Sequence, residues 1–283
     1  MSTREFSKPI SSSPNSTVVG YSLQDLSGSN FVGAALVAAD FRSSKLHHAL
    51  LETCDLSSAR LQGCDLSHAK ADGAILVNAV MIRSTILHAT FAGANLSSVI
   101  ALESNWTGSN LEAANFGGAQ LTWSSLDDAR LVGSSCLYAD LSHVKLSAAI
   151  ASGTNFERAS LFGARFDSTD FTDGSFEFAD LRSAVFTKCN FERASFVGAS
   201  FAGAQAFDCK FKDANFGWAE MGSFVHYNCN FSGGRFPAPV KIAYGPRGVE
   251  PPLVTPVPLY RSAITDDERR KAIEQAFEGI SKV

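Results

Sequence analysis

The sequence predicts an all-β solenoid built from five-residue units, and two observations lead to this fold class. A large apolar residue recurs at every fifth position from Leu26 to Phe236, which gives 43 units, with a few smaller or polar exceptions. A small residue, most often Ala, lies two positions before it. A period of five is neither the two of a plain strand nor the 3.6 of an α-helix. Similarity at a fixed period is typical of repeat architectures, in which stacked units share one continuous core.

The large position is filled mainly by Leu and Phe, with 17 and 16 occurrences. Up to Leu146 most of these residues are Leu, and from Phe156 onward most are Phe. Because stacked rings bury more area per residue, we expect the Phe half to be the more rigid. In two weaker stretches Ala holds the large position, and there we expect neighbouring apolar residues to shift inward: Ile75, Ile100 and Leu102.

Units such as Ala-Asn-Phe at 114–116 and Ala-Asp-Leu at 139–141 resemble the Ala-(Asp/Asn)-Leu-x-x unit of the pentapeptide-repeat family. The resemblance covers about three quarters of the chain. It implies a right-handed quadrilateral parallel β-helix, in which four units make one coil. The large and small residues would point inward and the other three positions outward. The chain would then form ten to eleven coils, and at about 4.8 Å per coil the rod would be roughly 50 Å long.

The composition divides the chain into four segments. Residues 1–25 are expected to be an N-terminal tail with a capping strand, and 26–236 form the β-helix. Seven of the nine prolines lie in the next segment, 237–263. Proline lacks the backbone donor that a ladder needs, so we expect an extended, polyproline-like strap. Its apolar residues favour adhesion to the solenoid. The remaining residues, 264–283, are expected to form a C-terminal α-helix.

The predicted C-terminal helix begins at Thr265, a suitable N-cap that is followed by three acids. An apolar stripe at helical spacing follows: Ile273, Phe277 and Ile280. The first interpretation is a capping helix that packs on its own solenoid. The second is a contact between two copies, which would make the protein a homodimer.

Charge and hydropathy limit the partners. The net charge is −4, and the segment 26–236 holds 20 acids and 15 bases. This balance disfavours direct nucleic-acid binding, which needs a basic stripe, and weakly supports a protein that imitates nucleic acid. No apolar run approaches the roughly 18 residues of a membrane helix, and the Ser-rich N-terminal residues lack the apolar core of a signal peptide. We therefore expect a soluble, cytoplasmic protein without membrane contact.

The six cysteines follow the inward rows. Cys136 holds a large position, and the others hold small positions: Cys54, Cys64, Cys189, Cys209 and Cys229. Cysteine there behaves as a small buried hydrophobe. We expect all six to be buried and unpaired, and we expect neither a metal nor another cofactor.

Outward residues 20 positions apart should lie above one another on one side of the rod. One such column holds His48, His68 and His88. We interpret it as an exposed, metal-free surface, with a metal site or a pH-sensitive ladder as the alternative. A neighbouring column holds Arg83, Glu103, Trp123 and His143. We interpret it as an ordinary mixed surface. The alternative is a ligand groove or a catalytic site that uses Arg83, Glu103 and His143.

A third column carries exposed aromatic residues in alternate coils, namely Tyr138, Phe178 and Trp218. Together with Trp123 they form the predicted binding surface, because contiguous exposed apolar residues mark a surface that something covers. The covering element is either a partner or the proline-rich strap with its helix.

No phosphate loop, nucleophile elbow or metalloprotease motif occurs in the sequence. We therefore expect a nonenzymatic protein that binds a macromolecule. The family resemblance implies protection of a type II topoisomerase, either DNA gyrase or topoisomerase IV, from a poison by a rod that imitates duplex DNA. A protein-interaction scaffold and a ligand-binding, metal-binding or enzymatic protein remain as alternatives.

Overall fold

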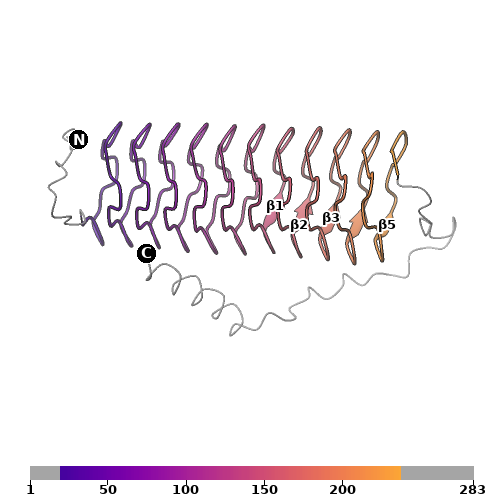
Figure 1. Cartoon of the computed structure of the whole chain (residues 1–283). Coiled ribbons are helices and arrows are strands. Elements are labelled where there is room, and N and C mark those ends of the chain that lie inside the picture. The colour runs from indigo at the N-terminus through magenta and orange to yellow at the C-terminus, as the bar shows by residue number, and fades with distance from the viewer. Residues whose placement is uncertain (1–19, 237–283) are drawn as a thin grey trace, which may run out of the picture. The chain divides into compact units, whose positions relative to one another are not determined.

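The computed structural model describes residues 20–236, and Figure 1 shows them as a stack of coils in sequence order. Most of the predicted N-terminal tail, the proline-rich strap and the C-terminal helix with Ile273, Phe277 and Ile280 lie outside the described residues. Residues 20–25, expected in the N-terminal segment, already follow the repeat, because Gly20 bridges Asp40 and the buried Tyr21 stacks on Phe41 at 4.8 Å.

The coils are joined by parallel bridges, in which every fifth residue pairs with the residue 20 positions later, from Gly20–Asp40 to Asn215–Arg235. On one side the bridges lengthen into a five-stranded parallel sheet in chain order. Its strands are β1 (Lys145–Ser147), β2 (Arg165–Asp167), β3 (Val185–Thr187), β4 (Gln205–Phe207) and β5 (Val225–Tyr227). Four five-residue units therefore make one coil, and the fold is a parallel β-solenoid.

Each described unit turns its corner two positions after the large residue, at a φ between 52° and 72°. Most residues there are not glycine, although side chains disfavour this left-handed region. Backbone hydrogen bonds between coils hold them in place. The His48 N–H, for example, donates to the Ser67 carbonyl at 3.0 Å, and the Ala49 N–H closes the turn on the Leu46 carbonyl at 2.9 Å.

The large residues form ladders of side chains inside the coils. In the Phe half the rings stack nearly parallel, as Phe196 does on Phe176 at 5.0 Å and on Phe216 at 5.1 Å. Several polar residues of the small row are buried and donate to carbonyls of the preceding coil. Ser84 Oγ reaches the Leu61 oxygen at 2.6 Å, and Ser124 Oγ reaches that of Ala101 at 2.7 Å. These bonds explain why Ser and Thr can replace Ala there.

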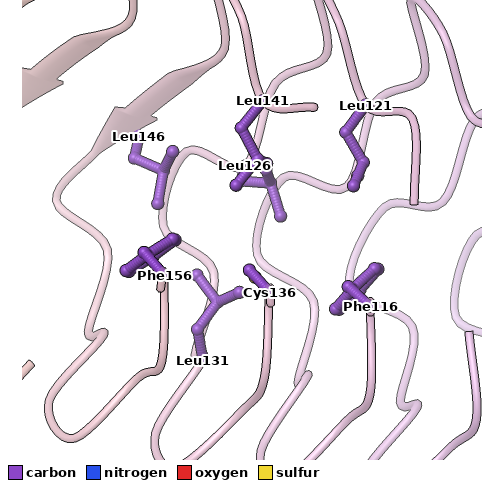
Figure 2. A pocket seen from close by; sticks show the side chains of 8 residues that line it. All are labelled: Phe116, Leu121, Leu126, Leu131, Cys136, Leu141, Leu146 and Phe156. Carbon is purple, nitrogen blue, oxygen red and sulfur yellow. The ribbon is translucent and has the colours of Figure 1, made fainter. Parts of the chain in front are cut away.

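A small internal cavity of about 10 Å³ lies where the Leu half meets the Phe half (Figure 2). Cys136 holds the large position between Phe116 and Phe156, and its side chain is shorter than the Leu and Phe that hold most of the other rungs. Apolar side chains line the cavity: Phe116, Leu121, Leu126, Leu131, Cys136, Leu141, Leu146 and Phe156. A void of this size without polar partners stays dry.

Two expectations about the interior are wrong: the apolar neighbours do not shift inward where Ala holds the large position, and one of the six cysteines is not fully buried. Ala71 and Ala101 stay buried in register, and Ile75 remains 40% exposed instead of shifting inward. The bridges on either side fix each unit, because a slip by one residue would break the ladder with both adjacent coils. Leu102 is buried, yet it keeps its outward position in the repeat. Among the six unpaired cysteines, Cys229 is only half-buried, because it belongs to the last described coil.

Candidate functional site

The histidine column gathers four imidazoles at one corner. His48 stacks on His68 at a centroid distance of 5.0 Å, and His68 stacks on His88 at 5.5 Å. His47, the first outward residue of the same turn, adds a fourth ring that lies 4.1 Å from His48 and 5.3 Å from His68. Desolvation lowers the pKa of His68, and its histidine neighbours lower it further. The lowered pKa favours the neutral form of His68 at neutral pH.

The stack of imidazoles ends at Gly108, the next residue of the column. A Cβ at this position would lie 2.3 Å from His88 Nδ1, so the ring occupies the space that a side chain would need. In the described part of the chain, no three His, Cys, Asp or Glu side chains are arranged to hold a metal ion. The rings contact one another face to face rather than converging on a common point.

The neighbouring corner pairs its residues two by two. Arg83 Nε donates to Glu103 Oε2 at 3.0 Å, so the two charges neutralise each other. Trp123 and His143 stack at 4.0 Å with an angle of 5° between the rings. Phe162, which sequence reasoning missed, meets the other side of His143 edge-on at 5.5 Å. Burial lowers the pKa of His143, so this imidazole is held in its neutral form between two apolar rings.

The aromatic corner consists of Tyr138, Arg158, Phe178, Gly198 and Trp218. Its three aromatic side chains are 60%, 51% and 84% exposed, in chain order. The Arg158 guanidinium lies 5.7 Å from the centre of the Tyr138 ring and 5.0 Å from that of Phe178. A cation between two aromatic rings is attracted to the faces of both, which stabilises the positions of the two ring side chains and of Arg158. Trp123, the fourth residue of the predicted binding surface, lies at the corner of His143, as its column predicted.

These residues lie on a solenoid whose units match a known family model. Residues 25–57, 59–97, 89–128, 104–135, 139–177 and 175–213 match the model described as pentapeptide repeats. The chain belongs to the pentapeptide repeat family. No helix among residues 20–236 is long and apolar enough to cross a membrane.

Several solved structures resemble this pentapeptide repeat protein. HetL, a pentapeptide repeat protein involved in heterocyst differentiation regulation from the cyanobacterium Nostoc sp. strain PCC 7120, is 26% identical. The match covers 69% of this chain and 88% of HetL, with a TM-score of 0.37. Full-length QnrB1, a plasmid-mediated fluoroquinolone resistance protein, is 20% identical over 66% of this chain and 93% of its own, with a TM-score of 0.44. No curated protein sequence matches the chain.

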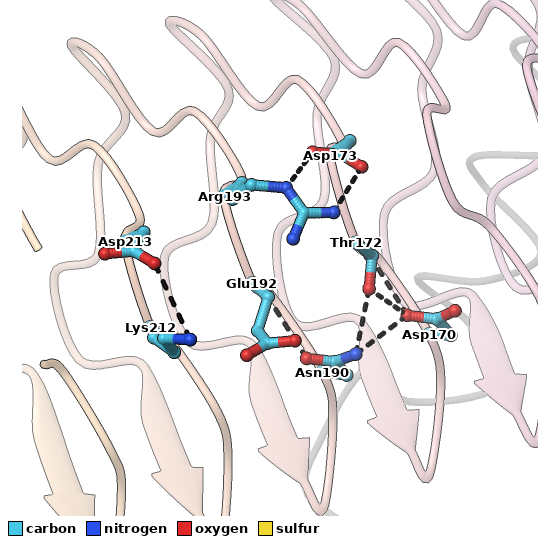
Figure 3. A network of polar contacts seen from close by, with 8 residues as sticks. All are labelled: Asp170, Thr172, Asp173, Asn190, Glu192, Arg193, Lys212 and Asp213. Carbon is cyan, nitrogen blue, oxygen red and sulfur yellow. Dashed lines mark hydrogen bonds and ion pairs between the residues drawn. The ribbon is translucent and has the colours of Figure 1, made fainter. Parts of the chain in front are cut away.

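Charged side chains of the pentapeptide solenoid pair along its outer surface (Figure 3). Arg193 binds both carboxylate oxygens of Asp173 at 2.7 Å. Asn190 donates to Thr172 Oγ1 at 2.8 Å and to Asp170 Oδ1 at 3.2 Å. Elsewhere Arg182 pairs with Asp180, and Arg130 with Glu112. In each of these pairs the Arg neutralises the charge of the carboxylate.

His47 and Phe162 share one reason for having been missed. Each predicted column contains only the second outward residue of each turn, whereas both outward residues of a turn occupy the same corner. The signal was present in the sequence, since His47 directly precedes His48 and Phe162 directly precedes the position above His143.

Proposed function

We propose that this chain is a nonenzymatic binding protein that recognises another protein through side chains on the corners of its coils. One observation carries the proposal. The outward side chains of Arg83, Glu103, Trp123 and His143 contact one another in fixed pairs along the surface. They do not converge on a cleft, and the cavity of Figure 2 is apolar and internal. Such a surface suits a broad, flat partner better than a small substrate.

The corner of Trp123 and His143 has the residue types that dominate binding energy in protein interfaces, namely aromatic side chains with Arg nearby. The Trp123 backbone N–H donates to the Ser142 carbonyl of the next coil at 3.1 Å, and the Trp123 ring stacks on His143 at 4.0 Å. A side chain that is already ordered loses little conformational entropy when a partner binds. Trp123 is therefore the first residue to test.

Within this proposal, a type II topoisomerase such as DNA gyrase is the partner to examine first. Support comes from membership of the family and from the net charge of −4. Duplex imitation would also need a continuous acidic stripe, and the pairing of acids with Arg in Figure 3 speaks against one there. Recognition by shape and aromatic contacts is thus favoured over imitation by charge.

The test is a gyrase supercoiling assay with added protein, with and without a quinolone poison. We expect the protein to restore supercoiling in the presence of the poison. Trp123→Ala should weaken this effect about tenfold or more, in the range of interface hot spots. Thr122→Ala, at the adjacent outward position, is the matched control. Restoration that is absent at every protein concentration would refute the choice of topoisomerase, and equal effects of both variants would refute the chosen corner.

A further inference from the structure

The aromatic corner contains two intervals of equal length, and they differ at their midpoints. Tyr138, Phe178 and Trp218 follow one another at intervals of 40 residues, which is two coils. Two coils correspond to about 9.6 Å along the solenoid. At the midpoint of the first interval, the Arg158 guanidinium lies 5.7 Å from the centre of the Tyr138 ring and 5.0 Å from that of Phe178. The midpoint of the second interval is Gly198, which has no side chain.

The second interval is a ladder of side chains with one rung missing. An added Cβ at Gly198 would lie 2.6 Å from the Phe178 ring, so this ring leans over the glycine, as His88 leans over Gly108. The next aromatic side chain of the column is Trp218. Phe178 is half-exposed although Arg158 covers one side of it, and Trp218 is 84% exposed. The two rings are therefore open to a group that comes from outside.

The first interval shows what a gap of this length can hold. Its two rings, which are two coils apart, have one planar cation between them. Both distances are within the roughly 6 Å at which a cation is attracted to a ring face. A group at the middle of the second interval would lie about 4.8 Å from the rung on either side. The gap therefore has room for one planar layer, which is either a cation or another flat ring.

Two carboxylates beside the gap favour a cation. Glu177 directly precedes Phe178, and Glu220 follows Trp218 by two positions. Each carboxylate accepts a hydrogen bond from a serine hydroxyl, at 2.8 Å for Glu177 and 3.1 Å for Glu220. Within residues 20–236 neither acid forms an ion pair with Lys or Arg. Both can therefore accept charge-assisted hydrogen bonds from a positively charged group.

We propose that the gap between Phe178 and Trp218 binds the guanidinium group of an arginine side chain on a partner protein. The bound group would stack between the two rings, as Arg158 does between Tyr138 and Phe178. A planar guanidinium suits the gap better than the ammonium group of lysine, because it stacks on ring faces. The inference rests on the proposed protein-binding function but not on the choice of a topoisomerase, since its test measures binding without that enzyme.

NMR spectroscopy of the isotope-labelled, full-length protein tests this inference. The probe is N-acetyl-arginine amide, which presents the side chain as a peptide does. The reporter is the indole N–H signal of Trp218, assigned with the variant Trp218→Phe. We expect this signal to shift until it saturates, while the signal of Trp123 stays in place. The affinity for the lysine analogue and for the uncharged citrulline analogue should be lower by about fivefold or more.

Two variants locate the site. Phe178→Ala removes one wall of the gap and should lower the affinity for the arginine probe about threefold or more. Tyr138→Ala is the matched control, because Tyr138 belongs to the other interval, and it should leave the affinity unchanged. Circular dichroism would verify that both variants are folded.

Three results would overturn the proposal. The first is a Trp218 signal that does not move, or that moves no more than the signal of Trp123, because the gap would then have no preference for the probe. The second is equal affinity for the arginine and citrulline probes, or an equal effect of the two variants. The third is a Trp218 signal that shifts with protein concentration in the absence of probe, because a second copy of the chain would then fill the gap.

Discussion

Replacing Phe196 by Ala tests whether the aromatic ladder carries the stability of the solenoid. Phe196 is fully buried, and its ring stacks between Phe176 and Phe216 at 5.0 and 5.1 Å. Phe191 and Phe201 meet it edge-on at 5.4 and 5.2 Å. Buried Phe→Ala changes cost about 3–5 kcal/mol. A fifth ring, that of Phe211, lies 6.0 Å away. Because all five ring contacts are lost together, and aromatic pairs add about 0.5–1.5 kcal/mol each, we expect the upper half of that range.

Equilibrium denaturation in urea, followed by circular dichroism, measures this loss. Solenoids unfold through interactions between neighbouring repeats, so a change in the slope of the transition would show that the coils on either side have uncoupled. The matched control is Phe178→Ala, which removes the same side chain from a half-exposed corner position and should cost less than about 1 kcal/mol. A loss below about 1 kcal/mol for Phe196→Ala would refute the assignment of these rings to the core.

Three further predictions follow from the rows and corners. Cys136→Leu, which fills the cavity of Figure 2, should raise the free energy of unfolding by about 0.5–2 kcal/mol. Cys54→Leu on the crowded small row should lower it by about 1–3 kcal/mol, and equal effects in urea would contradict the assigned rows. Because the other five cysteines are buried and Cys229 is half-buried, a thiol reagent should modify Cys229 first; rapid labelling of several thiols would disprove this. The melting temperature should fall between pH 7.5 and 5.5, because the pKa of His68 is lowered in the folded protein and the unfolded chain therefore takes up its proton first, near pH 6.5. His68→Gln should reduce this fall, and an unchanged pH dependence would show that the cluster is not its source.

The sequence alone predicted the interior well, because the interior repeats. An apolar side chain every five residues can be buried throughout only if successive coils superpose at one register, and the bridges follow that register from Gly20 to Arg235. The sequence could not predict how each exception is accommodated. Ser84 and Ser124 are buried because carbonyls of the preceding coil accept their hydroxyl groups, and Ile75 stays outside because both adjacent coils hold its backbone.

The sequence by itself determined the five-residue period and the inward rows, because these depend only on counting. The resemblance to the pentapeptide-repeat family implied the 20-residue register and therefore the corner on which each outward residue lies. Tertiary structure decided which outward side chains meet. His47 joins the histidine column, Phe162 covers His143, and Arg158 lies between two aromatic rings. The physical reason is that a long side chain at a corner can lean over the next coil or across its own turn. Its direction depends on the space left by neighbours, such as the missing side chain at Gly198, and not on the period of the repeat.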